Sequence, residues 1–150
     1  MDKIVIQTKD FDLTTEVDLI KSAQSSTGAV VSFIGTVRDL SSESLISLTI
    51  EHYPGMTEKS LALIAEKARE KWELESITII HRVGTLSIGD QIVLVITSSK
   101  HRQEAFDSCN YIMDYLKTDA PFWKKEASDK EEKWVINRSS DEKQKNRWRS

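Results

Sequence analysis

The chain has 150 residues, of which 39% are hydrophobic and 30% charged, as in a folded domain rather than a disordered segment. No run approaches the roughly 18 apolar residues that a membrane-spanning helix needs, and the start Met1-Asp2-Lys3 lacks signal-peptide character. We therefore expect a cytoplasmic protein that makes no membrane contact.

Charge is unevenly distributed along the chain. The formal net charge is −3, but residues 124–150 hold nine Lys or Arg against six Asp or Glu, which gives +3 there and −6 for residues 1–123. A basic end on an acidic chain suits an anionic ligand or an acidic partner segment.

The only cysteine is Cys109, which excludes an intramolecular disulfide and a two-cysteine redox relay. Its helical phase with Phe106 and Met113 predicts a position in the core. Any sulfur chemistry must therefore use sulfur that is brought from outside the chain.

The first half of the chain predicts strands and helices in mixed order. A strand over 3–7 precedes a helix over 14–24 with Asp12 as its N-cap. The β-branched segment 28–38 predicts a buried strand, and alternating apolar residues predict a half-buried strand over 46–51.

The middle of the chain predicts a helix that begins after Thr57 as its N-cap and carries an apolar stripe as far as Trp72. Two further strands are predicted over 76–83 and 91–97. The segment 84–90, rich in turn residues, connects them.

The last third predicts a helix over 101–116 with Phe106 facing inward, then a hairpin over 122–127 and 133–137. The capping-box spacing at Ser139 predicts a short final helix. Strands outnumber helices without strict alternation, which predicts the α+β class.

We expect a single domain over residues 1–150, in which the hairpin and short helix over about 121–150 form an appended part. There is no internal repeat, linker or low-complexity tract that would indicate a second domain.

The segment Tyr111–Ala127 is the best candidate for a site, because three lysines flank the apolar corner Ala120-Pro121-Phe122-Trp123. An amine that apolar groups shield from water is either a nucleophile or a strong anion-binding group. The lysines are Lys117, Lys124 and Lys125. The alternative is that they are ordinary surface lysines whose stems cover the hairpin.

Cations also open the predicted helix at Lys100-His101-Arg102, where they oppose the helix dipole unless an anion binds there. Solvated side chains are the alternative. Arg38, which follows a buried strand, favours a surface ion pair when taken alone. His52 lies in phase with buried residues and suits a structural histidine.

Several classes of protein find no support in the motifs. No metal site is expected, because neither HxxxH nor CxxC spacing occurs, and glycine-rich nucleotide loops and a GxSxG motif are also absent. Trp134 and Trp148 lie among basic residues, as in an RNA-binding surface. The acidic chain and the lack of an RNA-binding motif argue against a nucleic-acid partner.

Six segments together resemble the large, catalytic subunit of molybdopterin synthase. They follow the family's order from Gly28 to Asp141, and the longest are specific. The segments are GAVVSFIGTVR, LTIEHYPGMTEKSL, IIHRVGTLSIGD, SSKHR with Phe106, YIMDYLKTDAPFWKKE and KWVINRSSDE.

The resemblance implies a fold related to the α/β hammerhead with a small added antiparallel sheet. It implies a homodimer that binds one small ubiquitin-like sulfur-carrier subunit at each end, which makes a heterotetramer. The Gly-Gly thiocarboxylate of the carrier gives its sulfur to cyclic pyranopterin monophosphate, or precursor Z. Two such transfers form the dithiolene of molybdopterin in molybdenum cofactor biosynthesis, and no cofactor of the chain's own is implied.

The resemblance also implies site residues, position by position. Lys117 and Lys124 match the catalytic lysines, with Lys117 at the centre of the chemistry. Arg138 matches an arginine that is able to act across the dimer. The matched substrate-binding and pocket-wall positions are Arg38, His101, Arg102, Arg138, Phe33, Met113 and Pro121.

The sequence departs from the family pattern in two places. The loop over 39–44 is shorter and lacks a glycine that many members carry, so no contacts are transferred to it. Lys100 adds a charge where a small residue is common. A competing interpretation is a binding module that kept the pocket but lost the chemistry; its expected mark, loss of a pocket lysine, is not seen.

Overall fold

The structure is a computed structural model, and it describes residues 2–39, 45–128, 132–134 and 139–148. Its helices and strands confirm the predicted α+β class. In chain order they are β1 (Asp2–Gln7), α1 (Leu13–Ala23), β2 (Ala29–Thr36), β3 (Leu45–His52), α2 (Met56–Lys71), β4 (Ser76–Arg82), β5 (Gly84–Leu86), β6 (Gln91–Ser99), α3 (Arg102–Asp119), β7 (Phe122–Ser128), β8 (Glu132–Trp134) and α4 (Ser139–Asn146).

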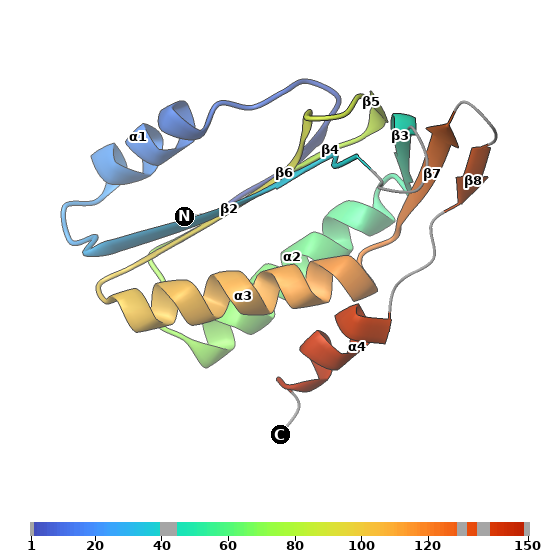
Figure 1. Cartoon of the computed structure of the whole chain (residues 1–150). Coiled ribbons are helices and arrows are strands. Elements are labelled where there is room, and N and C mark those ends of the chain that lie inside the picture. Colours follow the sequence, from blue (N-terminus) through green and yellow to red (C-terminus); the bar gives the residue numbers. More distant parts are fainter. Residues whose placement is uncertain (1, 40–44, 129–131, 135–138, 149–150) are drawn as a thin grey trace.

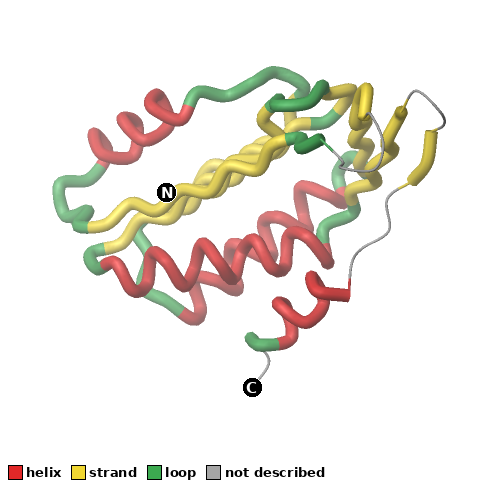
Figure 2. The backbone as a smooth tube through the Cα atoms, viewed as in Figure 1, coloured by secondary structure: helices red, strands yellow, loops and turns green. Residues whose placement is uncertain are grey.

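The larger sheet has the strand order β1-β4-β6-β2. β1 is parallel to β4, and the other two pairs are antiparallel. β4 and β6 are the interior strands, and both consist almost wholly of buried residues, as expected of strands covered on two faces. Helices α2 and α3 cover one face of this sheet and α1 covers the other (Figures 1 and 2).

The main hydrophobic core lies between the sheet and the pair α2 and α3. Ile77 and Ile79 of β4 meet Leu61 of α2 and Ile112 of α3 there, and all four side chains are fully buried. Full burial of each such side chain stabilises the fold by about 1.5–3 kcal/mol. This core fixes α3 to the sheet along its length.

A smaller core lies on the opposite face, under α1. Ile80, Leu94 and Ile96 are its buried members from the sheet, and Val17 and Ile20 of α1 pack on them while half-exposed. No residue of α1 is fully buried, so this helix is held less tightly than the other two. Asp12 caps it as predicted, because its carboxylate accepts the Thr15 N–H at 2.9 Å.

The second sheet has the order β5-β3-β7-β8, and it stands beside one end of the larger sheet (Figure 1). β3 and β7 pair antiparallel over most of their length. The predicted connection 84–90 contains a short strand, β5, which pairs with β3 from Leu48 to Ile50. Gly84, with φ +96°, supplies the turn that starts it.

The C-terminal helix α4 and the two residues after it are attached to α3 through two carboxylates, and Lys145 of α4 donates to Asp119 of α3 at 3.0 Å. Asp114 of α3 accepts a hydrogen bond from Arg147 at 2.8 Å and another from the Trp148 indole at 2.5 Å. The Trp148 ring packs edge-on against Tyr111 and Trp72. The predicted short final helix is thus confirmed and lies against the helix that carries Lys117.

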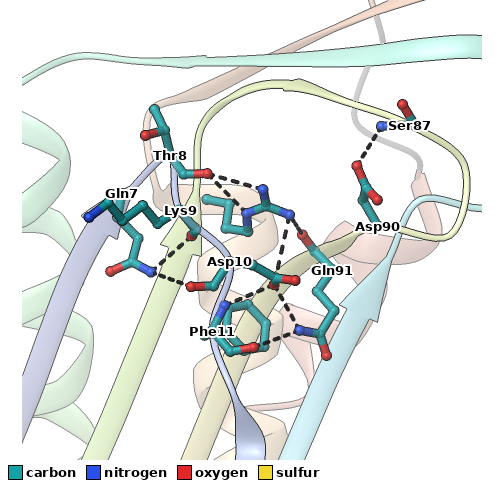
Figure 3. Close-up of polar contacts among 9 residues, drawn as sticks. Gln7, Thr8, Lys9, Asp10, Phe11, Ser87, Asp90 and Gln91 are labelled. Atoms are coloured by element: carbon teal, nitrogen blue, oxygen red, sulfur yellow. Dashed lines mark hydrogen bonds and ion pairs between the residues drawn. The ribbon is translucent and has the colours of Figure 1, made fainter.

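A polar network closes one end of the larger sheet (Figure 3). Arg82, at the end of β4, donates to the Thr8 carbonyl and, at 2.9 Å, to the Gln91 carbonyl. The Gln91 amide donates to the Asp10 carboxylate at 2.8 Å. This hydrogen bond, above all, keeps the pKa of Asp10 below its usual range. The network ties the β1–α1 connection to the start of β6.

Some local predictions are wrong for identifiable reasons. Gly55, with φ +86°, precedes α2 as its N-cap, and Thr57 lies buried in the first turn and donates to the Tyr53 carbonyl at 2.8 Å. Phe106 is 59% exposed although its spacing predicted an inward position. The part of the predicted hairpin over 135–137 lies outside the described residues.

Candidate functional site

The register of the larger sheet brings several chain segments to one of its ends. Thr36, at the end of β2, lies opposite Gln91 at the start of β6, and His81 near the end of β4 lies opposite Val93. Helix α3 follows β6 and runs back over the sheet, so its C-terminal end reaches the same edge, beside the second sheet (Figure 1). We call this edge the site end of the molecule.

Arg38 lies at the site end, just past β2, and its side chain is exposed. The residue before it is fixed, because Val37 donates to the Asp90 carbonyl at 2.9 Å and its own carbonyl accepts from Gly89 at 2.7 Å. Asp90 in turn accepts the Ser87 N–H at 2.9 Å, as Figure 3 shows. The guanidinium therefore projects from a rigid base.

Lys117 lies in the last turn of α3 and is exposed, with Met113 one helical turn before it. Met113 is 7% exposed and belongs to the main core. Met113, which the resemblance placed at the pocket wall, is thus a buried core residue in this chain. Its packing fixes the helical turn from which Lys117 extends.

The corner between α3 and β7 is held at Pro121. The Phe122 N–H donates to the Ala120 carbonyl at 2.9 Å, which makes a tight turn about the proline. The Pro121 carbonyl lies 3.4 Å from the Thr57 hydroxyl of α2, whose one proton goes to the nearer Tyr53 carbonyl at 2.8 Å. The turn at this corner sets the direction in which β7 starts.

Lys124 points to the core-facing side of β7. It lies opposite Ile50 of β3, which is 1% exposed, and residues directly opposite each other in antiparallel strands share a face. Lys125 is on the other face, where it pairs with Glu132 at 3.0 Å and lies 5.7 Å from the Trp134 ring centroid. Alternation along the strand separates the two neighbouring lysines.

Phe33 lies on β2, which is an edge strand, and pairs with Val95 of β6. It shares the face of Val31, which packs against the main core, and it is 38% exposed. A side chain at Gly35 would come within 3.4 Å of the Phe33 ring. The closer approach would be to the Val93 side chain, at 2.9 Å, so the glycine mainly leaves space for Val93 of β6.

His101 and Arg102 lie at the other end of α3, where both are exposed. Fifteen residues separate Arg102 from Lys117, which corresponds to about 22 Å along an α-helix. A single chain therefore brings Arg38, Lys117 and Lys124 to one end and keeps His101 and Arg102 at the other. Arg138 lies outside the described residues.

His81 is a residue near the site that the sequence analysis did not select. It is 2% exposed, and its ring stacks on Phe122 with centroids 3.8 Å apart and 15° between the planes. The pKa of His81 is lowered to about 4, mainly by burial and to a smaller extent by the charges of Lys124 and His52, while the hydrogen bond with the Arg82 carbonyl opposes the lowering. The only indication in the sequence that His81 is buried was its position in the apolar run of β4.

Cys109 is a core residue, as predicted. It is 5% exposed, and burial raises the pKa of its thiol to about 12, so it does not supply a thiolate. Within the described residues, no group of three His, Cys, Asp or Glu is placed to hold a metal ion. No helix in this part of the chain is long and apolar enough to cross a membrane.

Comparison with known proteins identifies the family. Residues 6–119 match the family model described as MoaE protein. The chain is 50% identical over 149 residues to a protein of Ralstonia nicotianae named molybdopterin synthase catalytic subunit, covering 99% of this chain and 85% of that one. A protein of Vibrio cholerae with the same name is 47% identical, with 97% of both chains covered.

Solved structures agree with these matches. The molybdopterin biosynthesis MoaE protein from Burkholderia ambifaria superposes with a TM-score of 0.86 at 49% identity, over 99% of this chain and 98% of that one. A complex of subunits 1 and 2 of molybdopterin-converting factor from Helicobacter pylori shares the fold, with a TM-score of 0.73 at 20% identity over 92% of each chain.

The chain belongs to the MoaE protein family. Its relatives at about half identity over nearly their whole length are named molybdopterin synthase catalytic subunits. The resemblance that the sequence predicted is thereby confirmed, and with it the expectation of an enzyme subunit of this kind.

The buried His81 makes the stability of the fold depend on pH. In the unfolded chain a histidine takes up a proton near pH 6.5, whereas His81 in the folded chain stays neutral down to about pH 4. Stability is therefore full above pH 6.5 and falls as the pH drops toward 4, by up to about 3 kcal/mol. Urea unfolding of the wild-type chain and His81→Phe at pH 7 and pH 4.5 measures this loss. It should be smaller in the variant, and equal losses would contradict the assignment.

Proposed function

We propose that this chain is the catalytic subunit of a molybdopterin synthase, a sulfurtransferase that forms the dithiolene of molybdopterin. In this proposal a small ubiquitin-like carrier brings sulfur as a C-terminal thiocarboxylate, and the acceptor is cyclic pyranopterin monophosphate. The observation that carries the proposal is the gathering of Arg38, Lys117 and Lys124 at the site end of a chain that belongs to the MoaE family.

The charges of the reactants explain why cations are needed. A thiocarboxylate and a phosphate are both anionic, so they repel each other in water and meet only where fixed positive charges stabilise them. Lys117 and Lys124 are the groups that we place beside the carrier's terminal carboxyl group and the negative charge that develops there. Arg38, with a planar guanidinium, is suited to the phosphate.

The carrier is the partner that this chemistry requires. The chain has one thiol, and it is buried with a pKa of about 12, so Cys109 is unsuited to supply the sulfur, and in this proposal the carrier supplies it. The Helicobacter pylori structure is a complex of two subunits of molybdopterin-converting factor, which supports a two-subunit assembly. We place the carrier's tail at the site end, against Lys117 and Lys124.

The distance along α3 leads us to propose that the functional pocket belongs to two chains. His101 and Arg102 lie too far from Lys117 in one chain for one phosphate to contact both groups. A homodimer with two-fold symmetry solves this if the start of one α3 meets the end of the other. Each of its two pockets then takes one carrier, which makes the heterotetramer, and Arg138 is proposed to join across the same interface.

Two roles for Lys117 differ in their products. As an acid or base, Lys117 moves a proton and forms no bond with the carrier. As a nucleophile, Lys117 uses its neutral amine to attack the carrier's terminal acyl carbon while that carbon is still bonded to the transferred sulfur; the C–N amide bond forms, the C–S bond breaks, and the sulfur leaves on the pterin. Mass spectrometry of the reaction mixture separates the two roles, because only the second gives a covalent adduct of chain and carrier.

Replacement of Lys117 by Ala should lower product formation by a factor of about 100 or more, because the charge that develops during transfer loses its partner. Carrier binding should stay measurable, since Lys117 is one exposed contact among many. The assay mixes the chain with thiocarboxylated carrier and cyclic pterin phosphate, and mass spectrometry detects the singly and doubly sulfurated pterin.

The matched control for this assay is Lys67→Ala, which removes an exposed lysine from helix α2. Its turnover should equal that of the wild-type chain. Near-normal turnover of the Lys117 variant would refute the role assigned to Lys117. No sulfurated pterin from the wild-type chain would leave only a module that binds the carrier.

The two-chain pocket predicts complementation between inactive variants. Lys117→Ala and Arg102→Ala chains are mixed in equal amounts under conditions that allow subunits to exchange. Half of the dimers are then mixed, and each has one pocket with both groups intact, so activity should recover to about a quarter of the wild-type value. If both groups act in the same chain, the mixture should stay as inactive as its components.

A further inference from the structure

The strand that holds His81 is a buried interior strand of the larger sheet. β4 is paired on both sides, and His81 lies opposite Ile6 of β1 and Val93 of β6. Its side chain shares the face of Ile77 and Ile79, toward α2, α3 and the start of β7. A buried imidazole at this place has a fixed position relative to the site end.

The hydrogen bond of His81 settles which ring nitrogen holds the proton. Nδ1 lies 2.8 Å from the Arg82 carbonyl oxygen, and a carbonyl only accepts, so Nδ1 is the donor. The neutral ring therefore carries its lone pair on Nε2. His81 is thus an oriented acceptor rather than a second cation in a region that already holds lysines.

The aromatic contact of His81 links it to β7. Its ring stacks on Phe122, the first residue of β7, and Phe122 lies opposite His52 of β3. Lys124 follows two residues after Phe122 and shares its face. The stack and the Pro121 turn together determine where this face of β7 starts, and hence where the Lys124 stem leaves the backbone.

The charges around His81 come from the same strands. Lys124 of β7 and His52 of β3 are the two groups whose charges act on the His81 ring, and both disfavour a proton on it. The coupling is reciprocal, so the state of the His81 ring acts on Lys124 as well. A neutral acceptor near an ammonium group favours its charged form.

We infer that His81 is a positioning residue for Lys124: through its stack on Phe122 it holds the start of β7, and it keeps a neutral ring on the side of β7 that Lys124 shares. This inference deepens the proposed function, because it concerns one of the two lysines on which that function rests. His81 touches neither carrier nor pterin in this account. It acts by fixing the place and the charge of Lys124.

The test measures Lys124 itself and needs neither carrier nor pterin. Lysines are converted to ¹³C-dimethyl lysines, which keep their charge, and their NMR signals are followed against pH; Lys124→Arg identifies the signal of Lys124. In His81→Phe, which keeps a stacking ring but has no nitrogen, the Lys124 pKa should fall by about half a unit or more. The Lys67 and Lys117 signals should titrate as in the wild-type chain.

A second variant separates the acceptor from the ring. His81→Gln keeps an amide oxygen near the place of Nε2 and should restore most of the wild-type Lys124 titration. Lys124 titrating alike in the wild-type chain and His81→Phe, with both folded by circular dichroism, would overturn the inference. If His81→Phe does not fold, His81→Met replaces it, with the same two outcomes.

If the chain transfers sulfur as proposed, the turnover of His81→Phe is a second measurement of the role of His81. His81→Phe should then lower kcat/KM for the carrier by about tenfold, because it weakens the position and the charge of Lys124, which the proposed function places against the carrier's tail. A chain that transfers no sulfur at all would refute the proposed function. The Lys124 titration would still decide the role of His81.

Discussion

The packing of α3 across the larger sheet is the constraint on which the rest of the site depends. Ile112 of this helix is fully buried against β4, so the helix cannot slide or turn relative to the sheet. Its direction, opposite to β6, carries Lys117 to the ends of β2 and β4 and leaves Arg102 at the other end. The distribution of positive charge is therefore a consequence of the core.

This arrangement is the reason for the homodimer that we propose. A chain that holds cations at both ends of one helix has two half-sites and no complete one, if one phosphate is to meet both groups. Pairing two chains about a two-fold axis would complete two pockets at once. In this account the homodimer is part of the catalytic design, because the pocket for two anions is built from two chains.

The alternation of side chains along β7 separates two lysines that have the same charge. Lys124 and Lys125 are neighbours of the same type, but β7 turns Lys124 toward the core face, beside His81 and Phe122, and turns Lys125 toward Glu132 and Trp134. The buried, neutral His81 shares the environment of Lys124 only. Two adjacent lysines thus have different surroundings because of the period of the strand.

The sequence predicted much of the fold because local patterns determine much of it. The apolar runs of β4 and β6 and the Asp12 cap were readable from single segments, and all are confirmed. The prediction of Thr57 as the N-cap of α2 was wrong, because Gly55, with its positive φ, takes that position. The prediction that Phe106 faces inward was wrong, because the apolar spacing along a helix does not show which of its apolar residues the sheet covers.

The candidate site was predictable in its residue types and less so in its geometry. Lys117, Lys124 and the proline corner stood out because cations beside apolar residues are unusual. The separation of about 22 Å between Arg102 and Lys117 follows from the fact that one continuous helix, α3, contains both residues. His81 gave no signal by itself, since its contacts with Phe122 and Lys124 arise between segments far apart in the chain.

The most direct test of this account is a crystal structure of the chain with cyclic pyranopterin monophosphate bound. We expect one ligand at each dimer interface, with Arg102 of one protomer and Lys117 and Lys124 of its partner within hydrogen-bonding distance of the same molecule. A ligand held by groups of one protomer alone, or bound away from Lys117, would contradict it.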